Sequence, residues 1–513
     1  MGASENAGER HMINRPLALL SGAILAAALA VLSPGESLAK DKLVVNLVGQ
    51  PATLDPHKHW NHDSYAVYRN VFDNLVTRDA AGEIVAQVAT SWKALSDTEV
   101  EFEIRDDISF HDGSKLTPAD VAFSVKRITN KDFKSPQLGQ FNKIIDATVA
   151  GDNKVVLTTD GPYPPLLAQL VKLSIVSEAH VTKVGDDEFN KSPMGSGPYK
   201  FSEWQRGVKV TLEANPNYWR GAAPFKTVEF LAVKDESTRL ANLKTGSADL
   251  IVNVNPDQVP EIKSDQAIKV LSSPTERVGY LMMNTQHGPL ADKRVRLAVA
   301  HGVDRQLIID ALLGGYGRTL PGLLTPAHFG YVEDIPELGF DPAKAKALLA
   351  EAGYSSDQEL LFNTSPNFDQ RIVQAIQQQL SEVGMNVKIE MSDQPTYLTR
   401  RRAPPEGFGG FVFGRWSCAC QDADGVLFAM FHSSSVWSKM ANPEMDKLLE
   451  AARSTLDKEV RMENYRKIHE LIYREVPSLP LYQVTSIYGA PTALSWAPTA
   501  NESMFIMDMS WSE

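Results

Sequence analysis

The chain has 513 residues, more than one ordinary hydrophobic core accommodates, so two or three domains are expected. Its composition, with 43% hydrophobic and 22% charged residues, is that of a globular protein. The formal net charge of −12 argues against a nucleic-acid partner, because phosphate binding requires a basic surface.

Residues 1–39 have the three parts of a secretory signal peptide. Basic residues precede an apolar run at Leu17–Leu32, and small residues follow up to Ala39. The run is shorter than the roughly 20 residues that span a bilayer, although an uncleaved anchor stays the alternative. We predict cleavage near Ala39–Lys40 and a soluble, exported product, with Met1 and Met12 both open as the start. No cysteine lies near this site, so a lipoprotein is not expected.

Strand-like and helix-like segments alternate along the rest of the chain, which predicts an α/β class with mixed sheets. Apolar alternation predicts strands at Lys42–Val48, Val88–Trp92, Val100–Ile104, Ala147–Ala150, Lys154–Thr158, Lys200–Trp204, Val208–Glu213, Val228–Val233, Tyr280–Asn284, Val387–Met391 and Gly410–Phe413. Helical periodicity predicts helices at Ser64–Leu75, Pro118–Ile128, Ser237–Thr245, Asp341–Ala352, Gln370–Val383, Met445–Leu456 and Glu459–Glu475.

The segment Phe110–Ile128 combines a turn with the start of a helix. Asp112-Gly113 is typical of a tight turn, because glycine tolerates positive φ. Thr117 is expected to be the N-cap, followed by Pro118 and, at the third helical position, by Asp120.

This segment closely resembles one found in the family-5 solute-binding proteins of ABC importers, which include dipeptide, oligopeptide and nickel binders. Further motifs of that family follow in its order over essentially the whole mature chain. They are LDPH at Leu54–His57, GSGPY at Gly195–Tyr199, NPNYW at Asn215–Trp219, DKRVRLAVAHGVDR at Asp292–Arg305, DPAKAKALLAEAGY at Asp341–Tyr354 and VPSLPLYQ at Val476–Gln483.

The resemblance implies a two-lobed periplasmic-binding-protein (Venus-flytrap) fold that closes over a solute. Lobe I would comprise residues 40–79, 195–272 and 485–513, with residues 80–194 as an inserted subdomain. Lobe II would comprise residues 273–484. The chain would cross between the lobes near Ser272 and Val484, which would form the hinge.

The richest candidate binding segment follows the predicted strand at Gly410–Phe413. It offers Arg415 for a ligand carboxylate, Trp416 for apolar contact, and Asp422 or Asp424 for an ammonium group. A surface loop with locally paired charges is the alternative.

The same segment departs from the pattern of the family's peptide binders. Those proteins carry an ammonium-binding Asp three residues before an acidic residue that is followed by Pro. Here Asp422 matches the acidic residue, Ala423 replaces the Pro, and Ala419 stands at the anchor position. The usual anchor for a peptide amino terminus is therefore expected to be absent.

Three further residues are candidates for lining the cleft: Asn284, Tyr482 and Tyr65. Asn284 either binds ligand or caps a turn. Tyr482 either lines the cleft or packs in the hinge, and core packing is favoured for Tyr65.

Five possible metal ligands lie within nine residues: Asp55, His57, His59, His62 and Asp63. His57 and His59 alternate on a predicted loop, and His62 makes no i, i+4 pair with either of them, so no metal is assigned; nickel binding and a cleft-lining role stay open. Cys418 and Cys420 are interpreted as free or weakly redox-active, because a bridge at that spacing closes a very small ring. Metal ligation is the alternative.

We therefore predict the periplasmic substrate-binding component of an ABC importer, with a peptide or peptide-like cargo. An opine, an oligosaccharide or a metal chelate is the alternative cargo, and a chaperone or chemosensory role could coexist. No cofactor and no catalytic residue are expected, since neither a phosphate-binding loop nor a nucleophile elbow is present. The partners would be the small ligand and the permease subunits, with the protein acting as a monomer.

Overall fold

The computed structural model describes residues 40–59, 61–418 and 420–512. The predicted signal peptide therefore lies outside the described residues. Residues Lys40–Ser512 cluster as one compact unit. The predicted α/β class with mixed sheets is confirmed, because parallel and antiparallel strand pairs share one large sheet.

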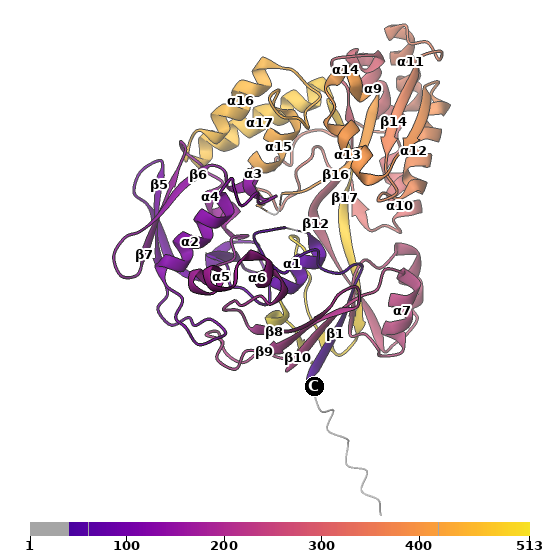
Figure 1. Cartoon of the computed structure of the whole chain (residues 1–513). Helices are drawn as coiled ribbons and strands as arrows, with labels where there is room; N and C mark the ends of the chain where they lie inside the picture. Colours follow the sequence, from indigo (N-terminus) through magenta and orange to yellow (C-terminus); the bar gives the residue numbers. More distant parts are fainter. Residues whose placement is uncertain (1–39, 60, 419, 513) are drawn as a thin grey trace, which may run out of the picture. The chain divides into compact units, whose positions relative to one another are not determined.

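This sheet has 11 strands among the described residues and joins N-terminal, central and C-terminal parts of the chain (Figure 1). Its order is β15 (Asn386–Met391), β14 (Glu359–Thr364), β16 (Phe411–Trp416), β12 (Ile268–Met283), β17 (Ser478–Pro491), β11 (Leu250–Ile251), β1 (Lys42–Leu47), β10 (Thr227–Ala232), β9 (Lys209–Ala214) and β8 (Tyr199–Gln205), with β13 (Gly317–Arg318) paired to β17. Strand β1 is parallel to β10 and β11, whereas β12 and β17 are antiparallel.

Strands β12 and β17 are the long pair that connects the two halves of this sheet. Their register is regular up to Pro274 opposite Thr485 and resumes at Val278 opposite Gln483. The interruption lies beside the predicted hinge crossings. It is bridged by side chains, since Thr275 Oγ1 donates to the carbonyl of Val484 at 2.8 Å.

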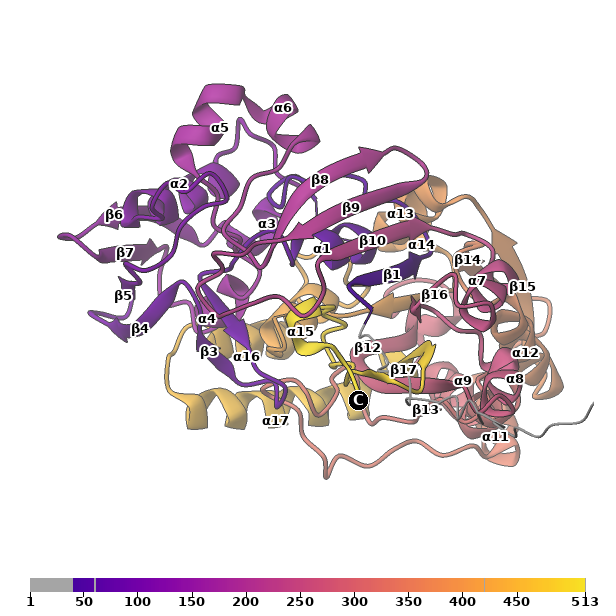
Figure 2. The same ribbon diagram turned by 90° about the horizontal axis from the view of Figure 1, so that it is seen from below.

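A separate four-stranded sheet lies in residues 80–194 (Figure 2). Its order is β4 (Ala89–Ala94), β5 (Glu99–Ile104), β7 (Lys154–Thr159) and β6 (Ile144–Val149). Helix α2 (Pro118–Thr129) begins where the sequence predicts, and the Asp120 carboxylate accepts from the Thr117 amide at 2.9 Å. Gly113 has φ +89°, as the predicted turn requires.

The other helices flank these sheets. They are α1 (His62–Tyr68), α3 (Leu138–Phe141), α4 (Leu166–Leu170), α5 (Glu178–Val184), α6 (Asp186–Lys191), α7 (Glu236–Lys244), α8 (Val259–Lys263), α9 (Lys293–Gly302), α10 (Arg305–Leu312), α11 (Pro342–Ala352), α12 (Gln370–Glu382), α13 (Gln394–Arg402), α14 (Pro405–Phe408), α15 (Asp424–Phe431), α16 (Pro443–Arg453) and α17 (Lys458–Glu475). Short elements complete the chain: β2 (Val76–Arg78), β3 (Ile84–Ala86), β18 (Leu494–Ser495), β19 (Ser510–Trp511) and the 3₁₀ turns η1 (Pro256–Gln258), η2 (Pro289–Ala291) and η3 (Ile506–Asp508).

The hydrophobic cores follow the predicted domains only in outline. One core draws on residues 43–72, 176–252 and 488–511, so residues 176–189 of the predicted insertion pack with lobe I. A second core draws on residues 75–175 with Met194, and thus includes Leu75 and Val76 of the predicted lobe I. The cores of the predicted lobe II draw on residues 278–482, with Ala168 of the insertion packed against them. This distribution supports the predicted division into lobe I, insertion and lobe II, which we keep as a proposal.

Candidate functional site

The segment after β16 is closed by a disulfide bond between Cys418 and Cys420. The interpretation of these residues as free thiols is therefore wrong. The turn brings their Cα atoms to 5.0 Å, within the usual range for a disulfide, so the small ring is sterically possible. Helix α15 packs against the bridge through Gly425, where an added Cβ would lie 2.3 Å from Cys418 Sγ.

Asp422 and Asp424 follow the disulfide and both contact arginines. Arg461 Nη2 donates to the two Asp422 carboxylate oxygens at 2.7 and 2.9 Å, with both side chains buried. Arg453 donates to both oxygens of Asp424 at 3.0 Å. Burial raises the pKa of Asp422, and the charge of Arg461 opposes that shift. These ion pairs indicate a structural role for both carboxylates. Their role in binding a ligand stays a prediction.

Trp416 ends β16 and lies in an aromatic and cationic cluster. Its ring meets Trp437 edge-on at 5.5 Å between centroids, and its Nε1 donates to the Gly425 carbonyl at 3.3 Å. The guanidinium of Arg401 lies 5.3 Å from the Trp416 ring centroid. This contact is a cation–π interaction, so Trp416 is held by neighbours in lobe II.

Asn284 follows β12 and caps a turn. Its Nδ2 donates to the carbonyls of Pro405 and Gly409 at 2.7 and 3.2 Å. Its Oδ1 accepts from the amides of Gln286 and His287, both at 3.1 Å. The amide group is therefore used within lobe II, and a ligand contact stays a prediction.

Tyr65 and Tyr482 line two different pockets. Tyr65 is buried in α1, meets Tyr68 edge-on at 5.6 Å between ring centroids, and borders a pocket of about 580 Å³ between lobe I and the insertion. Tyr482 lies opposite Gly279 in the hinge ladder, and a Cβ on that glycine would lie 2.9 Å from its ring. Burial raises the pKa of Tyr482 to about 12, so its hydroxyl stays protonated at neutral pH.

The pocket that Tyr482 borders, called the interlobe pocket below, receives residues from both predicted lobes. Its volume is about 290 Å³, at the lower end of the roughly 300–1,000 Å³ typical of ligand pockets. Its lining comprises Asn253, Val254 and Pro256 of lobe I, Leu313, Tyr316, Asp369, Ile372 and Arg415 of lobe II, and Arg277, Tyr482, Val484, Thr485, Ser486, Ile487 and Glu502 from the hinge strands and the C-terminal tail.

Arg415 is the predicted site residue that the structure places with Tyr482 in this pocket. Its Nη2 donates to the carbonyl of Asn367 at 2.8 Å, and its guanidinium lies 5.4 Å from the Phe368 ring centroid. Within the described part of the chain, no ion pair joins it to a carboxylate. Burial lowers the pKa of Arg415, because desolvation disfavours its charged form.

Sequence reasoning missed Arg277, Asp369 and Glu502, which also line the pocket. Arg277 Nη2 pairs with Glu502 Oε2 at 2.8 Å and contacts His62 Nε2. Burial alone raises the pKa of Glu502. The charges of Arg277, His62 and Arg415 and the hydrogen bond from Ser486 together outweigh burial and hold the pKa below its usual range. Glu502 and Asn253 both have positive φ, a strained backbone conformation that the sequence pattern does not predict.

The predicted histidine cluster is divided between different neighbourhoods. His57 is buried, with Nε2 2.9 Å from the Ser174 carbonyl and Nδ1 3.1 Å from Arg127 Nη1. Burial and the charge of Arg127 lower the pKa of His57 to about 4. His62 instead lies 3.4 Å from Glu502. Among the described residues, no group of three or more His, Cys, Asp or Glu side chains could hold a metal ion.

Comparison with known proteins decides the family. The family model of the bacterial extracellular solute-binding proteins, family 5, middle part, matches residues 83–438. The chain belongs to family 5 of these solute-binding proteins. It is 27% identical to heme-binding protein A of Haemophilus influenzae over 84% of each chain, and 26% identical to the dipeptide-binding protein of Escherichia coli over 89% of this chain and 91% of that one.

A solved structure of another protein has the same fold as this family-5 protein. The periplasmic binding protein DppA of Helicobacter pylori, associated with an ABC transporter and in complex with the peptide STSA, superposes with a TM-score of 0.80 at 25% identity. The match covers 93% of this chain and 99% of that one. The predicted two-lobed fold and the role as substrate-binding component of an ABC importer are thereby confirmed. Members of family 5 act outside the cytoplasm.

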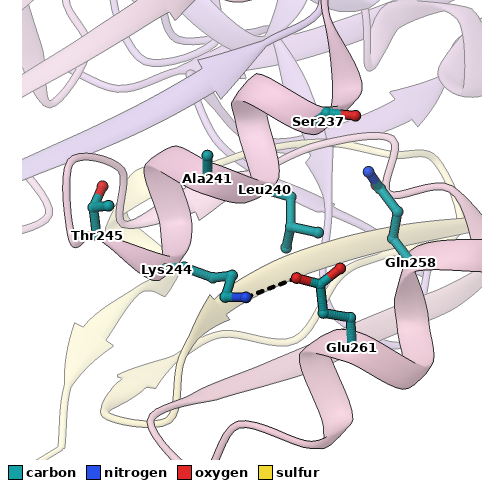
Figure 3. Close-up of a pocket in the computed structure, with 7 residues that line it drawn as sticks. All are labelled: Ser237, Leu240, Ala241, Lys244, Thr245, Gln258 and Glu261. Carbon is teal, nitrogen blue, oxygen red and sulfur yellow. Dashed lines mark hydrogen bonds and ion pairs between the residues drawn. The ribbon is translucent and has the colours of Figure 1, made fainter.

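Another hollow of this family-5 protein lies outside the interlobe region. It has a volume of about 380 Å³ and is bordered by α7, η1 and α8 (Figure 3). Its charged side chains, Lys244 and Glu261, pair with each other at 2.7 Å. All its lining residues belong to the predicted lobe I, so a solute here would contact one lobe only.

No helix in the described part of the chain combines the length and apolarity needed to cross a bilayer.

Proposed function

We propose that the protein captures a peptide or peptide-like solute in the interlobe pocket and delivers it to the permease of an ABC importer. The observation that carries this proposal is the lining of that pocket by both predicted lobes and by the hinge strands. Among the relatives, one is named for dipeptide and one for heme, so the family alone leaves the cargo open. The small volume of the pocket favours a short solute.

Closure is the step that the solute would control. Contacts between the predicted lobes are already made: Arg371 pairs with Asp257 at 2.8 Å, and Arg78 of lobe I donates to the Cys420 carbonyl at 2.5 Å. A solute that contacts both lobes binds the closed state more tightly. It therefore shifts the open–closed equilibrium by its differential affinity.

The protein performs no chemistry in this proposal. The one serine in an elbow-like motif, Ser196, is buried and donates from Oγ to Asp73 at 2.9 Å. ATP hydrolysis belongs to other subunits of the importer. We further propose a monomer, exported to the periplasm and cleaved near Ala39–Lys40 without a lipid anchor.

A thermal-shift screen tests the proposed cargo class. The mature chain, residues 40–513, is screened against dipeptides, longer peptides, N-acylated peptides, opines, oligosaccharides and nickel chelates. A solute present at 100 times its Kd stabilises the folded state by about 2.7 kcal/mol. A shift with any peptide class supports the proposal. A shift with only sugars or metal chelates would replace the peptide cargo by that solute.

A further inference from the structure

In the interlobe pocket, Arg415 is the charged side chain that makes no direct ion pair within the described part of the chain; the charges of Glu502 and Asp369 reach it only from a longer distance. Asp369 accepts from its neighbour Arg371 at 2.7 Å, and Glu502 accepts from Arg277 at 2.8 Å. Both acidic side chains of the pocket thus have an arginine partner. Arg415 has the neutral Asn367 carbonyl instead. The pocket therefore presents to its contents a guanidinium that has no carboxylate in direct contact.

The acidic residues nearest in sequence to Arg415 are also occupied. Asp422 is paired with Arg461 and Asp424 with Arg453, and neither of them borders the interlobe pocket. A free ammonium in this pocket would meet Arg277 and Arg415 with no unpaired carboxylate to offset them. Its desolvation would be uncompensated, which is costly for an ion.

The remaining lining of the pocket is mixed, with apolar side chains beside the polar Asn253, Thr485 and Ser486. Leu313, Ile372 and Val254 contribute aliphatic surface, while Tyr316 and Tyr482 contribute aromatic rings. The hydroxyl of Tyr482 is protonated at neutral pH and can donate a hydrogen bond. Such a pocket suits a small solute that has apolar and hydrogen-bonding parts and one acidic end.

We infer that the cargo is a small solute with a carboxylate and without a free amino group, such as an N-acylated amino acid or dipeptide, and that Arg415 binds its carboxylate. The inference rests on the proposed capture of a peptide-like solute and narrows it. Arg–carboxylate pairing is frequently bidentate and stronger than a neutral hydrogen bond. The incoming carboxylate would supply the ion-pair partner that the partly buried guanidinium lacks.

Four pools of the same random dipeptides, which differ only in whether the amino end and the carboxyl end are charged, test how each end contributes to affinity. The pools are N-acetylated acids, free zwitterions, N-acetylated amides and free-amine amides, and binding to the mature chain is measured by native mass spectrometry. Hits are then titrated by calorimetry. We expect the N-acetylated acids to bind at least about tenfold more tightly than the matching zwitterions and amides.

Substitution of Arg415 tests the assignment to this residue. Arg415→Gln should weaken the N-acetylated acids at least about tenfold and remove the preference for acid over amide. Arg466→Gln is the matched control, because Arg466 is an exposed arginine paired with Asp334 outside the pocket. Circular dichroism of each variant verifies that it is folded.

The outcomes distinguish the inference from the proposed function. Equal or tighter binding of the zwitterions, or an unchanged acid preference in folded Arg415→Gln, would overturn the inference and leave peptide capture standing. If no pool binds while a sugar or metal chelate shifts the thermal melt, peptide capture fails and the inference falls with it.

Discussion

Arg277 and Glu502 join the hinge strand β12 to the C-terminal tail through a 2.8 Å ion pair at the edge of the interlobe pocket. Two further bonds tighten the same joint. Ser486 Oγ of β17 donates to Glu502 Oε1 at 2.6 Å, and the Glu276 amide donates to the Ala500 carbonyl at 3.0 Å. The tail therefore holds both hinge strands where their ladder is interrupted.

Glu502→Gln should destabilise the folded protein. Removing one partner of a buried ion pair typically costs about 3–5 kcal/mol, and the 21% exposure of the Arg277 side chain places the expected loss near the lower end. Urea-induced unfolding followed by circular dichroism measures it. Lys226→Gln is the control, since its pair with Asp41 is exposed and should not matter. If both variants were equally stable, the proposed role of Glu502 in stabilising the fold would be wrong.

Asp422→Asn should lower stability without changing cargo affinity. Its partner Arg461 is buried, so loss of the carboxylate leaves an unpaired cation and costs about 3–5 kcal/mol. Calorimetric titration of the folded variant with any cargo found in the screen separates structure from binding. A loss of at least about 1.5 kcal/mol in binding an aminated ligand would instead restore the predicted ammonium role.

Stability should fall in mild acid through His57. The folded-state pKa is about 4, below the ordinary value of 6.5, so between these values the unfolded chain binds the extra proton. The His57 contribution is therefore present above about pH 6.5 and lost as the pH falls toward 4. The loss is on the order of 3 kcal/mol, from 1.36 kcal/mol per pKa unit.

Urea unfolding at a series of pH values measures this slope. His57→Gln should flatten it between pH 6.5 and 4, whereas His287→Gln, whose side chain is half exposed, should not. A slope that is identical in wild type and His57→Gln would refute the assignment.

Asp257→Asn should weaken cargo binding only slightly. Its pair with Arg371 joins the predicted lobes, but both side chains are exposed, so the pair is worth about 0–1 kcal/mol. The variant leaves Arg371 paired with Asp369 in the pocket. Affinity should fall at most about fivefold, and high salt should reduce the difference from wild type. A much larger loss, measured by calorimetry, would contradict the minor part assigned to this pair in closure.

Local signals predicted local structure well. Helix α2 begins at Pro118 because its turn and cap lie within a few residues of one another. Helix α1 was predicted to reach Leu75 but ends at Tyr68. Asn70 accounts for the difference, because its side chain binds the Ala66 and Met504 carbonyls and the Ile506 amide. Such a contact with the tail is invisible to periodicity.

The site was harder to predict because its charged side chains form ion pairs with residues that are distant in the sequence. Arg415 was found from its position after a strand, and the structure places it in the interlobe pocket. Asp422 and Asp424 looked equally available in sequence, but their partners Arg461 and Arg453 are 39 and 29 residues away. Glu502 reaches the same pocket from the tail. One sequence alone does not reveal which distant charges meet.

The first hydrophobic core is made from both ends of the described chain. It joins Leu43 and Val45 of β1 to Leu494, Ile506 and Met509, more than four hundred residues later. During synthesis, the early strands of lobe I have no complete surface on which to pack until this last segment emerges. Contacts of such separation also slow folding, because a long loop must close first. If the predicted signal peptide directs export, this late completion of the core would keep lobe I unfolded, and so able to cross a membrane, until the tail has been made.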